Sequence, residues 1–347
     1  MGWKFWVIAA SLLPLSQAAE KSCYYTLQRP AKVSIHWSLS HDAAYMIEVK
    51  DPSNRKTDAD VRVHDIARKT WTDLTLQLNT EELIFSRDGQ HVITHHYDDE
   101  KLHIFPFKNG AIDVAGEFEI ESQAIGYPVD DPEEFAPGIW MIGSTGELMD
   151  IQTRKILRLS FNGRGQGYLM APEQNKIYAY KRQKTPTGEF LTEFSVAELP
   201  TRITDQTPQP VYQPLPPFSM PEDMTSLSLH ADGKSVYVNH ASHRNRLVRY
   251  EFGKNTPVAT IDFPDDYSCI YISPDTRYRI CAGVKGKAPH RVALFDLEAQ
   301  RLVKQAYAPG EIQTMYAKFS PDMKKLVIQD YGKNVLLFHE LTEFLKP

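Results

Sequence analysis

The chain has 347 residues, with 39 lysines and arginines against 44 aspartates and glutamates, and a formal net charge of −5 at pH 7. This mildly acidic balance argues against a nucleic-acid partner, because binding to a phosphate backbone relies on an excess of positive charge. The length exceeds that of a typical single domain, but all-β barrels and propellers often run longer, so length alone does not set the number of domains.

The first residues have the layout of a secretory signal peptide. A lysine precedes an apolar stretch, Phe5–Leu15, that is too short to cross a bilayer as a helix, and the small residues Ser16 and Ala18 precede a suitable cleavage point after Ala18. We therefore predict that residues 1–18 are removed on export to the periplasm or the cell exterior, and that residues 19–347 form one mature domain. The rest of the sequence has no run of about 18 apolar residues, so no transmembrane segment is predicted.

One motif recurs along the mature chain: a short apolar strand, a turn that resembles Ser-x-Asp-Gly, and a second strand. Clear copies begin at Trp37, Leu83, Leu227, Ile270 and Ala317, and a weaker copy begins at Tyr168. The acidic residues of these turns are Asp42, Asp88, Glu173, Asp232, Asp275 and Asp322. The interval from Asp88 to Glu173 is twice the others, and a degenerate copy with Asp131 near the expected position fits its middle. A recurrence at this period indicates stacked or radial structural units.

Each copy is followed by a second hairpin, as in residues 61–76 and 292–307, so that one unit is a four-stranded antiparallel meander. We predict an all-β fold, a seven-bladed β-propeller, because radial packing buries the faces between blades and leaves only short sheet edges. Val335–Phe344 is expected to pair with a strand around Cys23–Gln28 and close the ring. Counts of six or eight blades remain open. The sequence lacks the sustained helical period that a parallel α/β fold requires.

The strand, turn and strand pattern resembles the YVTN and Tol-system classes of secreted, WD-repeat-like propellers over nearly the whole mature chain. The resemblance implies that ligands bind at one mouth of the central channel. That mouth would be formed by the loops that lead into each innermost strand and by those that join the second strand to the third. A fainter likeness, confined to residues 263–283, is to the heavy chain of the amine dehydrogenases, which is also an exported seven-bladed propeller.

Two of the three cysteines flank one of the repeated turns. A hairpin centred near Asp275 places Cys269 and Cys281 opposite each other on adjacent strands, and export to an oxidising compartment favours their pairing. We predict a disulfide between them, with two separately buried thiols as the alternative. Cys23 is then the unpaired thiol.

The loops expected at the mouth differ in charge. The loops that lead into the innermost strands are acidic and carry Glu81, Glu82, Glu222, Asp223, Asp265, Asp266 and Glu311. The loops that join the second strand to the third are basic. They carry Arg55, Lys56, Lys181, Arg182, Lys184, His243, Arg244, Arg246, Lys285, Lys287, His290 and Lys333. We predict an acidic centre with a basic rim that binds a protein or an anionic small molecule or glycan. The predicted ligand-binding residues are Glu82, Gln166, Tyr267, Gln313, His243, Arg244, Arg246, Lys285 and Lys287. The alternative is that these loops are merely solvated, because turns on the opposite face also carry Lys69, Arg154, Lys155 and Arg301.

No catalytic signature is recognisable, so a non-enzymatic binding or interaction module is the favoured function. The alternative is a propeller enzyme, a lactonase, a lyase or an amine-dehydrogenase-like subunit, whose candidate residues at the channel entrance are Glu222, Asp223, Asp265, Tyr267, His240 and Arg244. Blade two is rich in histidine, and His91 and His95 share one strand face, but their spacing disfavours a metal site. We predict neither a metal nor a cofactor.

A proline-rich segment, residues 199–223, is predicted as an insertion between blades four and five. Proline at this density favours an extended conformation that costs little entropy to order on binding. Two interpretations remain open: a loop that docks a partner through Tyr212 and Phe218, or a stiff surface connection.

Overall fold

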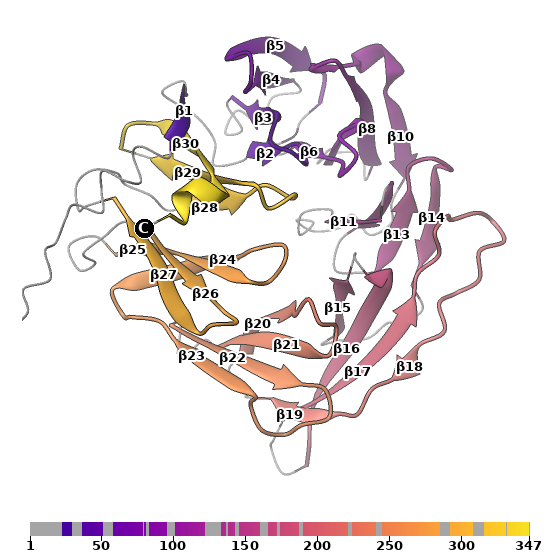
Figure 1. Cartoon of the computed structure of the whole chain (residues 1–347). Helices are drawn as coiled ribbons and strands as arrows, with labels where there is room; N and C mark the ends of the chain where they lie inside the picture. The colour runs from indigo at the N-terminus through magenta and orange to yellow at the C-terminus, as the bar shows by residue number, and fades with distance from the viewer. Residues whose placement is uncertain are drawn as a thin grey trace, which may run out of the picture.

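The structure is a computed structural model. It describes residues 23–29, 37–50, 58–78, 80, 83–95, 101–121, 133–136, 138–142, 146–159, 166–171, 174–186, 190–220, 224–240, 245–284, 292–307, 316–330 and 332–346. The described strands form seven antiparallel sheets that follow one another around a ring (Figure 1). The helices of the described residues are a 3-10 turn, η1 (Val114–Gly116), and one short helix, α2 (Leu341–Phe344). The fold is therefore the predicted seven-bladed β-propeller.

The first four blades follow the chain in order. Blade one contains β2 (Trp37–Leu39), β3 (Tyr45–Val49), β4 (Ala59–Asp65) and β5 (Thr70–Leu76). Blade two contains β6 (Leu83–Phe85), β7 (His91–His95), β8 (Lys101–Lys108) and β10 (Phe118–Glu121), with β9 (Ala111–Ile112) also paired to β8. Blade three contains β11 (Glu133–Ala136), β12 (Ile139–Ile142), β13 (Glu147–Asp150) and β14 (Lys155–Arg158). Blade four contains β15 (Gln166–Ala171), β16 (Lys176–Lys184), β17 (Phe190–Glu198), β18 (Gln213–Pro214) and β19 (Phe218–Met220).

The last three blades complete the ring. Blade five contains β20 (Met224–Leu229), β21 (Ser235–His240), β22 (Arg246–Glu251) and β23 (Ala259–Asp262). Blade six contains β24 (Tyr267–Ile272), β25 (Tyr278–Gly283), β26 (Val292–Asp296) and β27 (Arg301–Ala306). Blade seven contains β28 (Tyr316–Phe319), β29 (Lys325–Asp330), β30 (Val335–Glu340) and, as its outermost strand, β1 (Cys23–Gln28).

The ring closes through its two terminal strands. β1 pairs with β30 in antiparallel register, with Leu27 opposite Leu336 and Gln28 opposite Val335. This pairing of the first described strand with the last one confirms the predicted closure. Joining the ends in one sheet leaves no blade incomplete, because the chain supplies three strands of blade seven from one end and the fourth from the other.

The hydrophobic core lies between the blades. Each junction between neighbouring blades contains a cluster of buried apolar residues, such as that of Ile47, Val61, Phe85 and Phe105 between blades one and two. The other clusters fill the remaining junctions in the same way, including the closing junction between blades seven and one, where Trp37 is buried. Alternating apolar residues on each strand thus become buried only when the next blade covers them.

The repeated turns have a common hydrogen-bond pattern. In blade one, the Ser40 hydroxyl donates to Asp42 Oδ1 at 2.9 Å, and the backbone N–H of Tyr45 donates back to Ser40 Oγ at 2.9 Å. The same serine and aspartate pairs occur in blades two, six and seven. The residue after the aspartate adopts a positive φ, which explains glycine at Gly89 and Gly233.

Blade three departs from this pattern. Its first two strands, β11 and β12, are joined at positions 137 and 138, and Gly138 has a φ of 80°. The prediction that Asp131 is the turn acid of this blade is therefore wrong, because Asp131 precedes β11 in the chain. The backbone N–H of Gly138 instead donates to Glu134 Oε1 at 2.8 Å, so an acidic side chain on β11 itself bonds to this connection.

The predicted disulfide is present. Cys269 and Cys281 lie opposite each other on β24 and β25, and their sulfurs are bonded. Cys23 is the free cysteine. The cross-link joins the innermost strand of blade six to its second strand and closes a short loop, with a sequence separation of 12.

Removal of this disulfide is expected to destabilise the folded protein. Cross-linking a loop of this length restricts the unfolded chain, so the double variant Cys269→Ala/Cys281→Ala should lose about 2–4 kcal/mol of unfolding free energy in urea titrations. The matched variant Cys23→Ala should unfold like the wild type. A count of three reactive thiols in the oxidised, urea-denatured wild type, in place of one, would show that the bond does not form.

The proline-rich segment is part of blade four. Its residues form β18 and β19, and both strands pair with β17 at the outer edge of the blade. Phe218 is fully buried and Tyr212 packs against the core between blades three and four. The docking interpretation is therefore wrong for Phe218, because its ring is inside the fold. Proline suits an edge position because the outer side of an edge strand needs no N–H donors.

Candidate functional site

The strand bounds place two sets of connections at one end of the ring. In an antiparallel meander, the segment that leads into the innermost strand and the segment that joins the second and third strands lie at the same end of the blade. Most of the predicted mouth residues lie outside the described residues: Glu82, Glu222, Asp223, His243, Arg244, Lys285, Lys287 and Gln313. For Gln166 and His240 the structure describes only the backbone.

The described part of this end contains a small polar cluster between blades five and six. Asn245 Nδ2 donates to Asp265 Oδ1 at 3.1 Å, and Arg246 Nε lies 2.6 Å from Asp262 Oδ1. Both Arg246 and Asp262 are well exposed. Asp265 and Arg246 therefore lie at the same end of the molecule. Asp265 has the neutral Asn245 as its partner, and Arg246 has the acidic Asp262.

Tyr267 is placed differently from its predicted role. Its ring is 2% exposed and belongs to the core between blades five and six. Its hydroxyl accepts a hydrogen bond from Gln305 Nε2 at 2.9 Å. The side chain therefore packs within the fold and does not line the mouth.

The long hairpin of blade four carries further cations at this end. β16 and β17 are paired from Lys176 and Glu198 to Lys184 and Phe190, so the basic residues predicted on a loop lie on the end of a strand. Arg182 stacks its guanidinium 4.2 Å from the Phe190 ring centroid, and Lys184 Nζ lies 5.5 Å from it. The aromatic ring holds both cations near the tip of the hairpin.

Arg279, which the sequence did not single out, is a buried cation at the junction of blades five and six. It lies on β25, is 4% exposed, and donates from Nη2 to Asn239 Oδ1 at 2.8 Å and to the carbonyl of Cys269 at 3.4 Å. Its guanidinium lies 4.8 Å from the centroid of the Phe263 ring. Nε and Nη1 are buried without a hydrogen-bond partner, and burial lowers the pKa of the group to about 10. Among the described residues, no carboxylate forms an ion pair with it.

The histidines of blade two have different surroundings. His91 packs edge-on against Phe118, and burial lowers its pKa, whereas the side chain of His95 lies outside the described part. His103 instead lies beside carboxylates, with Nδ1 2.5 Å from Glu117 Oε1 and 3.9 Å from Glu119 Oε1. These three ligand atoms all lie within 4.8 Å of one another. Lys101 Nζ pairs with Glu119 at 2.6 Å, so one of the two carboxylates already has a lysine as its partner.

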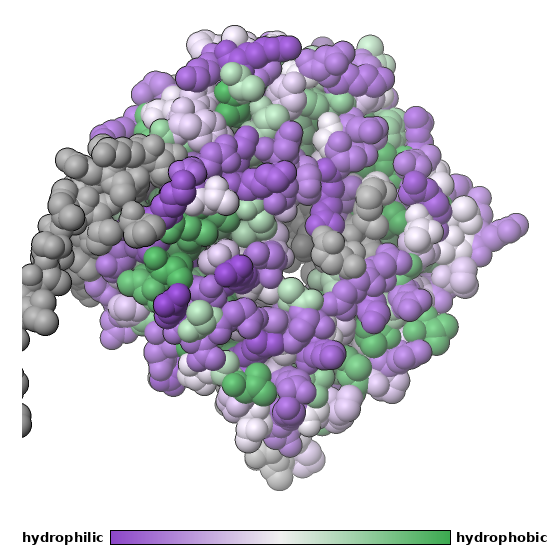
Figure 2. Space-filling view, viewed as in Figure 1, coloured by the Kyte–Doolittle hydropathy of each residue, from purple (hydrophilic) through white to green (hydrophobic). Residues whose placement is uncertain are grey.

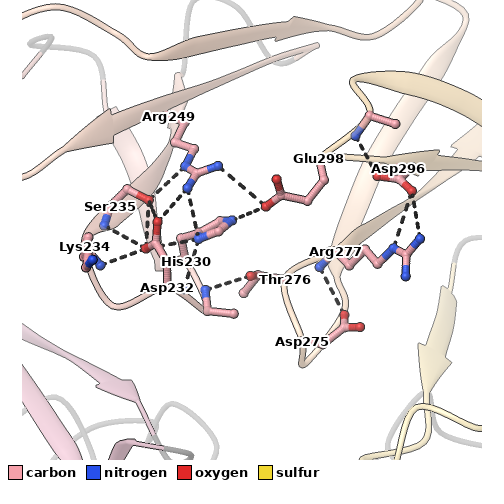
Figure 3. Close-up of polar contacts among 12 residues, drawn as sticks. His230, Asp232, Lys234, Ser235, Arg249, Asp275, Thr276, Arg277, Asp296 and Glu298 are labelled. Atoms are coloured by element: carbon pink, nitrogen blue, oxygen red, sulfur yellow. Dashed lines mark hydrogen bonds and ion pairs between the residues drawn. The ribbon is translucent and has the colours of Figure 1, made fainter.

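The opposite end of blades five and six contains a connected polar network (Figure 3). His230 replaces the serine of the repeated turn, and the hydroxyl is supplied by Ser235, which donates to Asp232 at 3.1 Å. Arg249 donates to Asp232 at 2.6 Å, and His230 Nε2 lies 2.6 Å from Glu298 of blade six. The network rebuilds the turn and ties the two blades together, which is a structural role.

Glu134 is a buried carboxyl group with an altered proton affinity. Burial raises its pKa to about 7, against the opposing hydrogen bonds from the backbone N–H groups of Arg87 and Gly138. A carboxyl group of this kind is a candidate general acid or base when a substrate can reach it. Here its oxygens accept from the turn of blade two and from its own hairpin, so it joins blades two and three.

A groove of about 300 Å³ lies on the outer edge of blade four. It is lined by Lys176, Val196, Ala197, Glu198, Val211 and Gln213, between β17 and the proline-rich segment. Val211 is 82% exposed beside it. The groove is on the outer surface of blade four and is separate from the channel.

No protein-family model matches the chain, and no curated protein matches its sequence. Among solved structures, the β-propeller domain of Cps50 (Swd1) from Myceliophteria thermophila is 11% identical, with a TM-score of 0.52 over 92% of this chain and 98% of that one. Hsv2 from Kluyvelomyces marxianus is 9% identical, with a TM-score of 0.49 over 89% and 97%. A 6-phosphogluconolactonase-like protein from Bacteroides uniformis is 15% identical, with a TM-score of 0.37 over 88% and 80%.

These similarities concern the fold, because the sequence identities are low. With seven antiparallel blades, a core at each junction and closure by β1 and β30, the chain is a seven-bladed β-propeller. Propellers of this architecture serve as interaction platforms as well as enzymes, so the fold does not by itself assign an activity. In the described part of the chain, no helix has the length and apolar character needed to span a bilayer.

Proposed function

We propose that this protein is an exported propeller that acts as an interaction module and binds an acidic protein partner on the end of the ring that carries the basic connections. The observation behind the proposal is topological. The meander brings the cation-bearing second-to-third-strand connections of several blades to one end, where scattered sequence positions become one surface.

The described residues support a positive rim at this end. Arg246 is exposed at the start of β22, and Arg182 and Lys184 are held at the tip of the β16–β17 hairpin by Phe190. Lys285 and Lys287 lie outside the described residues, and we include them in the proposed rim because they follow β25 in the sequence. Charges placed around a rim act mainly on the rate and specificity of association with a complementary surface.

Export is the second part of the proposal. The signal-peptide layout of residues 1–18 and the disulfide between Cys269 and Cys281 are both consistent with an oxidising compartment, the periplasm or the cell exterior. Expression with the native N-terminus should yield a mature chain that begins at Ala19, as measured by mass spectrometry of the exported protein. Recovery of the full-length chain in the cytoplasm only would contradict export.

The rim is tested by reversing its charge. A variant with Arg244, Arg246, Lys285 and Lys287 changed to glutamate is expected to bind fluorescent poly-L-glutamate at least about tenfold more weakly than the wild type at low salt, since it replaces attraction with repulsion. The measurement is fluorescence anisotropy. The control variant carries the same number of reversals at the other end of the ring, at Lys69, Lys234, Arg301 and Lys324. Equal weakening in both variants would reject the rim as the binding face.

A further inference from the structure

A buried guanidinium with no carboxylate partner among the described residues lies between blades five and six. Arg279 is 4% exposed, and among the described residues its partners are the neutral groups Asn239 and the Cys269 carbonyl. Burying a cation without a counter-ion is unfavourable, so an arrangement of this kind is normally compensated by an anion. Nε and Nη1 are left without a hydrogen-bond partner, although both are strong donors.

Small polar side chains connect the guanidinium to an innermost strand. β20 and β24 are the innermost strands of blades five and six and border the centre of the ring (Figure 1). On β20, Ser226 is exposed, and its hydroxyl accepts a hydrogen bond from Asn239 Nδ2 at 2.9 Å. Asn239 Oδ1 in turn accepts from Arg279. A continuous polar path therefore joins the exposed Ser226 hydroxyl to the buried guanidinium.

The surroundings of the path are suited to a ligand of small size. Ser226 and Ser228 of β20 lie opposite Asn239 and Tyr237 of β21, and both are small polar residues. Figure 2 shows one face of the ring, which is hollowed at its centre and bordered there largely by hydrophilic residues. A small solute in the channel would thus meet polar groups before it meets the cation.

We propose that Arg279 is the anchor of an anion-binding site in the channel wall between blades five and six, which binds a carboxylate or a phosphate group of a small ligand. Asn239 and Ser226 position the guanidinium and form the approach to it. The charge of the ligand compensates that of Arg279, which explains why the fold retains an arginine among apolar neighbours such as Phe263. The site is separate from the basic rim and does not depend on it.

The test is a thermal-shift titration with succinate and, separately, with inorganic phosphate, each compared with chloride at equal ionic strength. The wild type is expected to show a saturable rise in its unfolding midpoint with at least one of the two anions, and the more effective anion identifies carboxylate or phosphate as the ligand group. The Arg279→Met variant should show no such rise, and its midpoint without anion should equal or exceed that of the wild type, because methionine fills the space without a buried charge.

The remaining outcomes are decisive as well. Arg279→Lys, which keeps the charge, should retain a weakened response, and the charge-reversed rim variant should respond like the wild type. An equal response in the wild type and Arg279→Met would overturn the proposal, as would a wild type that neither anion stabilises. A response that is lost in the rim variant and kept in Arg279→Met would move the anion to the rim and likewise overturn it.

Discussion

Replacing Glu48 with glutamine is expected to lower the free energy of unfolding by about 3–5 kcal/mol. Glu48 accepts a hydrogen bond from Arg29 Nε at 2.9 Å and lies 2.9 Å from His64 Nε2, and both carboxylate oxygens are therefore engaged. The side chains of Arg29 and Glu48 are fully buried. The variant removes the buried carboxylate that accepts from Arg29, and the loss of a buried, hydrogen-bonded charge pair costs far more than the loss of an exposed pair.

The location of Glu48 makes this a test of ring closure. Arg29 directly follows β1 of blade seven, whereas Glu48 and His64 lie on β3 and β4 of blade one. Urea denaturation measures the effect. The matched control is Asp73→Asn in the same blade, which weakens the partly exposed ion pairs of Asp73 with Arg62 and Lys50 and should change the stability by less than Glu48→Gln does. Similar midpoints for the two variants would show that the buried triad does not hold the closing junction.

Glu48 also predicts a dependence on pH. Burial alone would raise its pKa, but the hydrogen bond from His64 and the attraction to Arg29 outweigh burial and lower the pKa below its ordinary value of 4.5. A carboxyl group whose pKa is lower in the folded state contributes stability above its unfolded pKa and loses this contribution as the pH falls through the folded pKa. Below about pH 4, the unfolding free energy of the wild type should therefore fall more steeply with decreasing pH than that of Glu48→Gln.

The turn chemistry explains why so much of the fold was predictable from the sequence. A serine and an aspartate two residues apart fix a hairpin by local hydrogen bonds, as Ser86 and Asp88 do in blade two, so each copy of the motif marks a strand pair wherever it occurs. The disulfide followed from the same hairpin geometry. The prediction failed at Asp131 because the acidic side chain that bonds to the turn of blade three is Glu134, which lies on β11 and not in a Ser-x-Asp-Gly motif.

The buried charges were not predictable for the opposite reason, since their partners are distant in the sequence. Arg279 bonds to Asn239, which lies 40 positions earlier in the neighbouring blade, and Glu48 pairs with Arg29 across the closing junction. A signal was nevertheless present. Arg279 stands alone among apolar residues in the strand from Tyr278 to Gly283, and a charged residue at an inward position of such a strand indicates either an error in the register or a buried ionic role.

The proline-rich segment gives the second large effect, because its outer strands depend on one aromatic side chain. Phe218 is fully buried and stacks 5.5 Å from Phe194 and 5.7 Å from Tyr250, measured between ring centroids. Phe218→Ala is expected to lower the unfolding free energy by about 3–5 kcal/mol, since the cavity lies between blades four and five, where both blades contribute to its walls.

A control from the same segment separates this packing role from a general effect of altering the segment. Val211 is 82% exposed, and Val211→Ala should change the stability by less than about 0.5 kcal/mol. Urea denaturation followed by intrinsic fluorescence gives both values, and limited proteolysis should cut the segment faster only in Phe218→Ala. Wild-type stability in Phe218→Ala would mean that blade four ends at β17 and that the proline-rich segment lies over it without stabilising it. Because β18 and β19 together pair with both halves of β17, we expect Phe218→Ala to be strongly destabilising. The fourth strand of this blade would then be supplied by a proline-rich sequence that resembles a linker.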